Sequence, residues 1–202
     1  TIKIDLFLQG RITKFLEVLN FLYIPVNFHG WAEKCFYWKK KWPVFQPEHL
    51  NSEKVNLYYF IDKLSEKLKE NAIVIGDAGS ALFVPGQAFK NKEGQILILS
   101  GGQSEMGFTI PACVGASVAK GEIIGVVGDG SFQLNIQELQ TIVHHNLPIK
   151  LFVWNNEGYL TIRNTQKKFF GGNFVGCDLE TGDISFPSIE SLTLKIFEYC
   201  FE

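Results

Sequence analysis

Short apolar runs alternate with helical patterns along most of this chain. A helical spacing of apolar residues begins at Asn56 and continues to Leu68. Four runs of apolar, mostly β-branched residues then have the length of buried strands, at 73–75, 96–99, 123–127 and 149–153. Helical patterns follow these runs at 80–89, 110–120, 132–144 and 159–168. This alternation predicts an α/β fold, a doubly wound parallel sheet whose ligand binds at the carboxyl ends of the strands.

The first 50 residues have a different character. An apolar stripe at helical spacing, 12–22, is followed by a stretch rich in Trp and Lys, 31–42, which ends at Pro43. At 202 residues and 46% hydrophobic content, the chain has room for one sizeable α/β domain and a short extra piece. We therefore expect residues 1–50 to be the tail of a preceding, middle domain with its linker, and residues 51–202 to form the principal domain.

Composition and charge limit the kinds of partner and the cellular location that we expect for this protein. A net charge of −2, without a basic patch interleaved with aromatic residues, argues against nucleic acid as a partner. The four cysteines, Cys35, Cys113, Cys177 and Cys200, are not spaced as metal ligands, so we expect reduced thiols in a cytoplasmic protein. No signal peptide and no apolar stretch of membrane-spanning length are evident, so we expect no membrane association.

The most informative residues follow the third and fourth apolar runs. Gly128 and Gly130 flank Asp129 in a Gly-Asp-Gly-Ser turn, and Asn156 follows Asp129 by 27 positions, after the next run. The two glycines permit a tight turn and the close approach of a ligand. Ser131 is expected to cap the helix that follows, and the positive end of that helix favours an anion such as a diphosphate.

A divalent cation fits the same residues. Mg²⁺ takes oxygen ligands and is commonly shared between one or two carboxylates and substrate phosphates. Asp129 supplies a carboxylate, Asn156 a neutral oxygen, and Gly158 a carbonyl with no side chain in the way. The alternative is a pair of ordinary strand-to-helix turns, in which Gly, Asp, Asn and Ser are common anyway. The occurrence of both halves at this spacing favours a metal and diphosphate site.

Other candidate motifs carry less weight. Gly102 and Gly107 have the spacing of a P-loop, but Phe108 and Thr109 stand where Lys and Ser or Thr are required. No GxGxxG motif follows a strand, which argues against a nicotinamide site. The histidine pair at 144–145 lies where a cation near the end of a helix is the simple interpretation.

Taken together, the two motifs resemble the thiamine-diphosphate signature, in which GDG is followed at a distance by NN. Segments 100–111, 137–142 and 146–150 are similar to the acetolactate-synthase-like branch of that superfamily, and the resemblance covers roughly residues 50 to 190. It implies that residues 51–202 form the diphosphate-binding domain of the thiamine-diphosphate-binding fold, truncated at the C-terminal side. It also implies an enzyme, a transferase or lyase, that decarboxylates a 2-oxo acid such as pyruvate and transfers the resulting acyl unit.

The resemblance assigns roles to individual residues. Asp129 and Asn156 match the two side-chain ligands of Mg²⁺, and Gly158 matches a backbone carbonyl ligand of the same ion. Met106 matches an apolar residue that holds the cofactor in its bent form, although a methionine that fills a gap in the core is the ordinary alternative. The cofactor-binding residues that the resemblance implies are Gly79, Ser80, Ser104, Met106, Gly128, Asp129, Gly130, Ser131, Asn156 and Tyr159.

The chain departs from acetolactate synthases at two places. Gly79-Ser80-Ala81 stands where they carry Gly-Gln-His, so a diphosphate contact there falls to the Ser80 hydroxyl or to amides. Ser104-Glu105 stands where they carry Gly-Thr, and Glu105 is either part of the substrate pocket or a solvated loop acid. These departures bear on the conversion of pyruvate to acetolactate and leave cofactor binding intact.

The resemblance further implies that catalysis needs more than this chain. In the family, the Glu that activates the aminopyrimidine belongs to a pyrimidine-binding domain of a partner subunit. We therefore assign no catalytic residue here and expect the chain alone to be inactive. The full-length protein is expected to be a homo-oligomer, a dimer or tetramer, with FAD as a candidate second cofactor. Two alternatives stay open, a small subunit of a split 2-oxo-acid decarboxylase and a non-catalytic partner that has kept the fold.

Overall fold

The computed structural model describes residues 3–22, 28–51, 53–119, 122–178 and 180–181. Cys200 and the expected C-terminal truncation fall outside these residues. The chain divides into two compact units, Thr1–Pro43 and Val44–Glu202, and each is described by itself.

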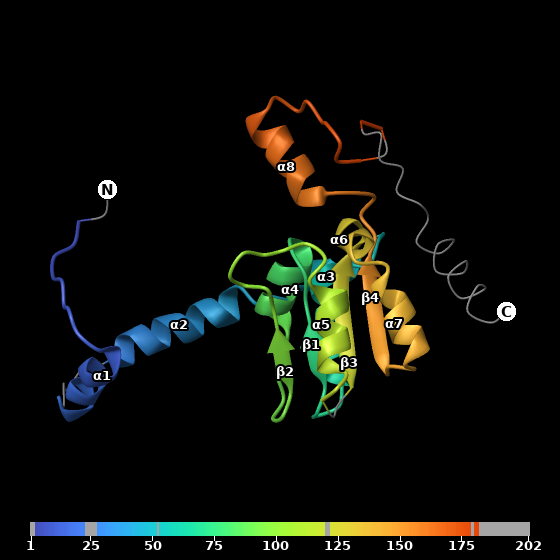
Figure 1. The fold of residues 1–202 in the computed structure, drawn as a ribbon. Coiled ribbons are helices and arrows are strands. Elements are labelled where there is room, and N and C mark those ends of the chain that lie inside the picture. The colour runs from blue at the N-terminus through green and yellow to red at the C-terminus, as the bar shows by residue number, and fades with distance from the viewer. Residues whose placement is uncertain (1–2, 23–27, 52, 120–121, 179, 182–202) are drawn as a thin grey trace. The chain divides into compact units, whose positions relative to one another are not determined.

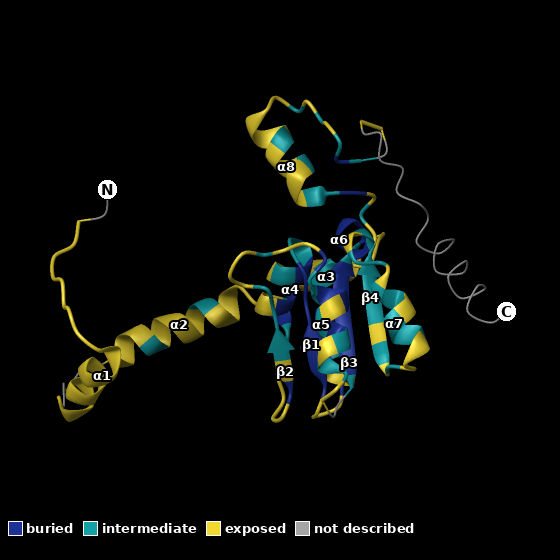
Figure 2. Ribbon diagram, in the orientation of Figure 1, coloured by how far each residue is buried: buried dark blue, intermediate teal, exposed yellow. Residues whose placement is uncertain are grey.

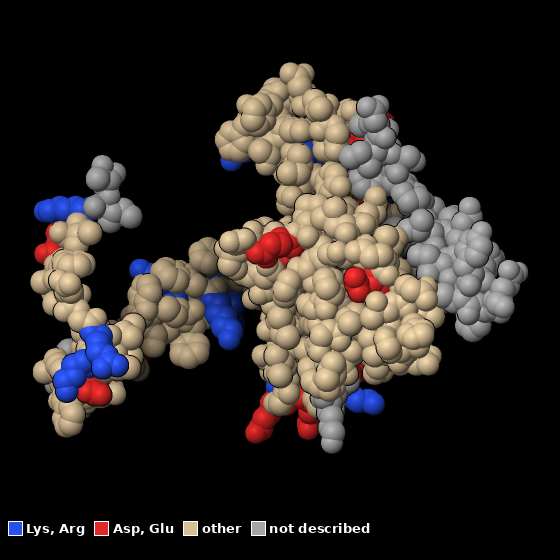
Figure 3. All heavy atoms as spheres, viewed as in Figure 1, with Lys and Arg blue, Asp and Glu red and all other residues tan. Residues whose placement is uncertain are grey.

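The first unit contains two helices, α1 (Ile12–Phe21) and α2 (His29–Lys41), and neither has a buried residue. Its contacts are mainly local: the rings of Trp31 and Trp38 pack edge to face, with centroids 5.7 Å apart. Figure 3 shows Lys and Arg side chains gathered on these helices, whereas most of the visible surface of the second unit carries no charge. Among the described residues, the first unit therefore forms helices without a hydrophobic core of its own.

The second unit is built on a four-stranded, entirely parallel sheet with the strand order β2-β1-β3-β4 (Figure 1). The strands are β1 (Ile73–Ile75), β2 (Ile96–Ile98), β3 (Ile123–Gly128) and β4 (Ile149–Trp154). From β1 the chain passes to β2 on one side and then crosses to β3 on the other side. The carboxyl ends of β1 and β3 therefore flank the point where the strand order reverses, which is where open α/β sheets bind ligands.

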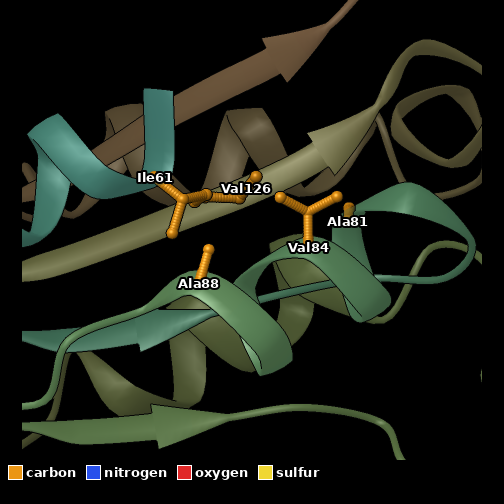
Figure 4. Packing of buried hydrophobic residues seen from close by; sticks show 5 residues of the cluster. All are labelled: Ile61, Ala81, Val84, Ala88 and Val126. Carbon is orange, nitrogen blue, oxygen red and sulfur yellow. The ribbon is translucent and has the colours of Figure 1, made fainter. Parts of the chain in front are cut away.

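Helices cover both faces of this sheet. A 3₁₀ helix, η1 (Pro47–Asn51), precedes six α-helices: α3 (Leu57–Lys67), α4 (Ser80–Ala88), α5 (Thr109–Ala116), α6 (Asp129–Leu134), α7 (Glu138–His144) and α8 (Leu160–Phe169). On one face, Ile61 of α3 and Val84 of α4 pack with Val126 of β3, as Figure 4 shows. On the other face, Ile110 of α5 packs with the adjacent Val127. Successive residues of one strand thus face opposite layers, and the predicted doubly wound parallel sheet is confirmed.

The burial pattern explains why the strands could be recognised. Buried residues concentrate on β1 and β3 (Figure 2), and all three residues of β1 are buried. Strands covered on both faces read as continuous apolar runs rather than as alternating ones. For this reason the four predicted runs match the observed strands to within one residue at each end.

Two predicted helices differ from the observed ones. The pattern at 132–144 predicts one helix, but two form, because the chain leaves the helical conformation at Asn135. The Asn135 side chain donates a hydrogen bond to the Gly107 carbonyl, a contact 28 positions away that local periodicity does not contain. The helix predicted at 110–120 ends at Ala116, and the Ser117 hydroxyl donates to the Val114 carbonyl just beyond its last turn.

The described cysteines are free thiols. Cys35 is exposed, whereas Cys113 and Cys177 are buried. Burial raises the pKa of the Cys113 thiol to about 12, so it stays protonated at neutral pH and serves as a small core residue. Among the described helices, none combines the length and the apolar character that a membrane crossing requires.

Candidate cofactor and metal site

A pocket of about 450 Å³ lies at the carboxyl ends of β1, β3 and β4. It brings together residues that are up to 107 positions apart in the sequence, since both Lys54 and Thr161 line it. The predicted site residues in its lining are Gly79, Ser80, Met106, Gly128, Asp129, Gly130, Ser131, Asn156, Gly158 and Tyr159. Ser104 is the one predicted cofactor residue outside the lining, and the backbone there has a φ of 61°, with its N–H donating to the Ser100 carbonyl.

Two oxygen atoms in this pocket are buried without a hydrogen bond. Asp129 is only 2% exposed, and its Oδ2 accepts from the Gly158 N–H at 2.9 Å. Its Oδ1 finds no partner among the described residues, and neither does Oδ1 of Asn156. Buried polar atoms are nearly always paired, so two unpaired oxygens in one pocket indicate a ligand that completes them. A carboxylate oxygen and an amide oxygen suit a hard divalent cation such as Mg²⁺.

The loop that follows Asn156 is held in one conformation by its own contacts. Gly158 has a φ of 129°, and a Cβ at this position would lie 2.3 Å from the Cys177 carbonyl oxygen. That carbonyl also accepts from the Tyr159 N–H at 2.9 Å. Only glycine therefore fits at position 158, where the resemblance expects a backbone ligand to the cation.

Arg163 fastens the same loop from α8. Its guanidinium donates to the carbonyl oxygens of Asn156 and Glu157, each at 2.7 Å. A third guanidinium contact, at 3.4 Å, reaches the Cys177 carbonyl. Sequence reasoning missed Arg163 and Cys177, because neither occupies a recognisable motif position and both act through backbone groups brought close by the fold.

The first turn of α6 forms another wall of the pocket. The helix begins at Asp129, so Ser131 lies inside it, and the prediction that Ser131 caps this helix is wrong. The cap position is Gly128, which has no side chain to bond the first amides. The Tyr159 ring lies against Gly130, where a Cβ would be 2.4 Å from the ring carbon Cε1. At Gly128 and Gly130 the turn therefore presents its backbone to the pocket, beside the side chain of Asp129.

A second buried aspartate, which the sequence reasoning missed, follows β1. Asp77 is completely buried, and its Oδ2 accepts from the Thr109 N–H at 2.9 Å. Its Oδ1 accepts from the N–H groups of Ala78 and Gly107. The signal available in the sequence was an acid directly after an apolar run, the same signal that drew attention to Asp129.

Glu105 and Met106 lie side by side in the loop between β2 and α5, but differ in position. Met106 is 37% exposed and lines the pocket. Glu105 is exposed and is not among the lining residues, which favours the solvated loop acid of the two interpretations left open for it.

The fold and the site together define an α/β cofactor-binding domain with a pocket suited to an anion and a divalent cation. Comparison with known proteins identifies its family. The profile described as "Thiamine pyrophosphate enzyme, C-terminal TPP binding domain" matches residues 77–192. Because this match covers more than half of the chain, the protein belongs to that family, and thiamine diphosphate is the cofactor that such a domain binds.

Several relatives carry the name acetolactate synthase. The acetolactate synthase large subunit of Porphyra purpurea is 31% identical over 191 residues, which are 92% of this chain and 32% of the relative. The chloroplastic acetolactate synthase of Arabidopsis thaliana is 30% identical over 82% of this chain and 25% of the relative. The acetolactate synthase isozyme 2 large subunit of Escherichia coli K12 is 29% identical over 81% of this chain and 29% of the relative. The chain thus spans about a third or less of these relatives.

Proposed function

We propose that this chain is the cofactor-anchoring domain of an enzyme that decarboxylates a 2-oxo acid, such as pyruvate, and transfers the resulting acyl unit. The observation that carries the proposal is the pair of buried, unpaired oxygens of Asp129 and Asn156 in one pocket. Membership of the thiamine pyrophosphate enzyme family and the similarity to acetolactate synthases support the reaction class.

In this proposal Asp129, Asn156 and the Gly158 carbonyl would hold Mg²⁺, and the ion would supply positive charge for the diphosphate. The Gly158 N–H already fixes one oxygen of the Asp129 carboxylate, so the other is oriented before the ion arrives. Arg163 holds the carbonyls of Asn156 and Glu157, which restrains the ligand loop. The protein would thereby hold its proposed ligand groups in place before the ion binds.

The diphosphate would meet backbone groups at the starts of two helices. Gly128, Gly130 and Ser131 form the wall made by α6, and the first amides of a helix have no intrahelical partner. Gly79 and Ser80, at the start of α4, form a second wall. These contacts would leave the charge of the diphosphate balanced by Mg²⁺ and by helix amides.

When bound, thiamine diphosphate supplies the carbon nucleophile that adds to the carbonyl of the 2-oxo acid and then takes up the electron pair left by CO₂. The chain's own part is to hold the cofactor and to shape its surroundings. Met106 offers its thioether side chain to the pocket, while Leu57, Phe60 and Phe152 provide an apolar wall that limits water. No acid of the described pocket lining other than Asp129 is available for proton transfer, so we assign that task to a residue of another domain.

The properties of the whole enzyme extend this proposal. We propose a homo-oligomer, a dimer or tetramer, in which a partner subunit contributes the pyrimidine-binding domain and its activating Glu. FAD is a candidate second cofactor of the full-length protein. A cytoplasmic location stays a prediction, and some relatives, such as the enzymes of Nicotiana tabacum, are named as chloroplastic.

Calorimetric titration with thiamine diphosphate, with and without Mg²⁺, tests the proposed site. We expect binding that requires Mg²⁺ and that falls by at least about a hundredfold in Asp129→Ala, because the only carboxylate ligand is lost. Asp62→Ala is the matched control, since Asp62 is a buried acid outside the pocket that pairs with Lys90. Unchanged affinity in Asp129→Ala, or an equal loss in both variants, would contradict the assignment.

Turnover of pyruvate tests the proposed division of labour. We expect none from the 202-residue chain alone, and partial activity after addition of a separately produced pyrimidine-binding half that docks onto it. Decarboxylation by the chain alone, above a control with buffer and cofactor, would show that no further acid is needed. Cofactor binding without activity in any combination would favour the non-catalytic partner instead.

A further inference from the structure

The loop that carries Met106 has a defined shape. Met106 lies between two residues with positive φ, Ser104 at 61° and Gly107 at 83°. On the N-terminal side, the Ser104 N–H donates to the Ser100 carbonyl at 2.9 Å and closes a turn. On the C-terminal side, the shape depends on Gly107, the residue that follows Met106.

Gly107 is held through both of its backbone polar groups. Its N–H donates to Asp77 Oδ1 at 3.2 Å, and its carbonyl accepts from Asn135 Nδ2 at 2.8 Å. The space beside it is full, since a Cβ would lie 2.9 Å from both Leu134 Cβ and Asn135 Nδ2. Two side chains therefore clamp one glycine and fix where the preceding side chain starts.

Asp77, which accepts from the Gly107 N–H, links this glycine to the sheet. The residue lies two positions after the end of β1 and is completely buried. Besides Gly107, its carboxylate accepts from the N–H groups of Ala78 and Thr109, each at 2.9 Å. One side chain thus joins the end of β1, the Met106 loop and the start of α5, and a carboxyl side chain is suited to this because its two oxygens can accept several hydrogen bonds.

Asn135, which donates to the Gly107 carbonyl, links the same glycine to α6, the helix that carries the proposed metal ligand Asp129. It ends α6, whose first residue is Asp129. Its Nδ2 donates to the Gly107 carbonyl, while its Oδ1 accepts from the Gln137 side chain at 3.1 Å in an exposed contact that solvent can replace. The same short helix therefore carries the proposed metal ligand at one end and the clamp at the other.

We propose that Asp77 and Asn135 are positioning residues, which clamp Gly107 so that Met106 stands against the thiamine part of the bound cofactor. Neither residue lines the pocket, so neither is expected to touch the diphosphate. The inference rests on the proposed cofactor site. It predicts that the two side chains matter for the organic part of the cofactor and not for its diphosphate.

Comparison of two ligands separates this role from a merely structural one. Thiamine diphosphate and inorganic pyrophosphate, each with Mg²⁺, are titrated into the wild type and into Asn135→Ala. We expect Asn135→Ala to weaken thiamine diphosphate binding about tenfold, the size of one lost, partly buried hydrogen bond, and to change pyrophosphate binding less than about twofold. Gln137→Ala, which removes a neighbour of Asn135 but no contact to Gly107, is the matched control and should change neither affinity.

Two further variants place the effect at Met106. Met106→Ala should show the same selective loss, and the double variant Met106→Ala/Asn135→Ala should lose little more than either single variant, since both act through one contact. Asp77→Asn should act in the same direction, although it also loosens α5. An equal loss for both ligands in Asn135→Ala, or additive losses in the double variant, would overturn the proposal.

Met106 also provides a probe that needs no ligand. It is the only methionine of the sequence, so a ¹³C-methyl label on methionine yields one resonance, assigned by its disappearance in Met106→Leu. We expect Asn135→Ala to shift or broaden this resonance in the ligand-free protein and Gln137→Ala to leave it in place. An unchanged resonance in Asn135→Ala overturns the clamp. If the wild type bound neither ligand, the proposed function would fail, while this resonance would still decide whether the clamp exists.

Discussion

Two buried aspartates lie just beyond the carboxyl ends of neighbouring strands, but they make different numbers of hydrogen bonds. Asp77 follows β1 and Asp129 follows β3, both strands are parallel neighbours, and both carboxylates are almost completely buried. Asp77 accepts three backbone N–H groups with its two oxygens. Asp129 accepts one, from Gly158, and its other oxygen has no partner among the described residues.

The difference is between a carboxylate whose two oxygens both accept hydrogen bonds and one that has an oxygen without a partner among the described residues. A buried carboxylate with all its hydrogen bonds made stabilises the native state, whereas one with an unpaired oxygen costs stability. Proteins keep such costly groups where a function needs them. The contrast supports a structural role for Asp77 and the proposed ligand-binding role for Asp129, although the sequence around the two residues looks alike.

The largest expected effect concerns the glycine that supports Asp129. Gly158→Ala introduces a Cβ at a φ of 129° and 2.3 Å from the Cys177 carbonyl oxygen, and we expect it to destabilise the chain by about 3 kcal/mol. Gly128→Ala is the control, because a Cβ there meets nothing within 4 Å, and it should cost less than about 0.5 kcal/mol. Urea denaturation measures both. Similar stabilities for the two variants would show that the loop at Gly158 tolerates a side chain and does not need a glycine.

Asp77→Asn tests the satisfied aspartate. An asparagine offers one acceptor oxygen where the carboxylate offers two, so at least one of the three N–H groups loses its partner. We expect a loss of about 2 kcal/mol in the free energy of unfolding. The control is Asp62→Asn on α3, whose acid pairs with lysines at the surface. A loss in Asp77→Asn no greater than in that control would argue against the organising role.

Asp129→Asn tests the unpaired aspartate and should have the opposite sign. The change removes a buried charge with an unpaired oxygen, and Oδ1 of the new asparagine can still accept from the Gly158 N–H. We expect the ligand-free chain to be unchanged or more stable by about 1 kcal/mol. Thermal unfolding without Mg²⁺ and cofactor measures this. A marked loss of stability would mean that the two aspartates are both structural, and the comparison would fail.

The smallest expected effect concerns Glu122, an acid just before the start of β3. It shows how little a partly exposed ion pair contributes in comparison with the two buried aspartates. The hydrogen bond from the Lys150 side chain, with its charge, holds the pKa of Glu122 below its ordinary value of 4.5. A lowered pKa in the folded state means that the pair stabilises above pH 4.5 and that this stabilisation is lost as the pH falls through the lowered pKa. Because the Lys150 side chain is 64% exposed, we expect Glu122→Gln to cost less than about 1 kcal/mol at pH 7, and we expect this cost to shrink as the pH falls below 4.5. A cost that does not shrink with falling pH would rule out the ion pair as its source.

Much of the fold could be predicted from the sequence alone. The central strands β1 and β3 are buried, so each appears as a continuous apolar run, and the outer strands β2 and β4 keep enough apolar residues to be recognised. The turn around Asp129 and the pair ending at Asn156 were readable for a related reason, because residues at the carboxyl ends of parallel strands must meet at one edge of the sheet. All predicted site residues except Ser104 accordingly lie in the one pocket.

The remaining features depend on contacts between distant positions. Asn135 interrupts a periodic pattern because its side chain bonds Gly107, and Arg163 and Cys177 act on a loop whose backbone they meet only in the folded chain. Nothing local distinguishes Asp77 from Asp129, since each is an acid after an apolar run. The sequence by itself determined which segments are strands and which polar residues gather at their ends, because burial on both faces imposes a pattern on each segment separately. Only the tertiary structure decided which of those polar groups are satisfied and which stay open for a ligand, because hydrogen bonds at Asp77 come from amides as many as 32 positions away.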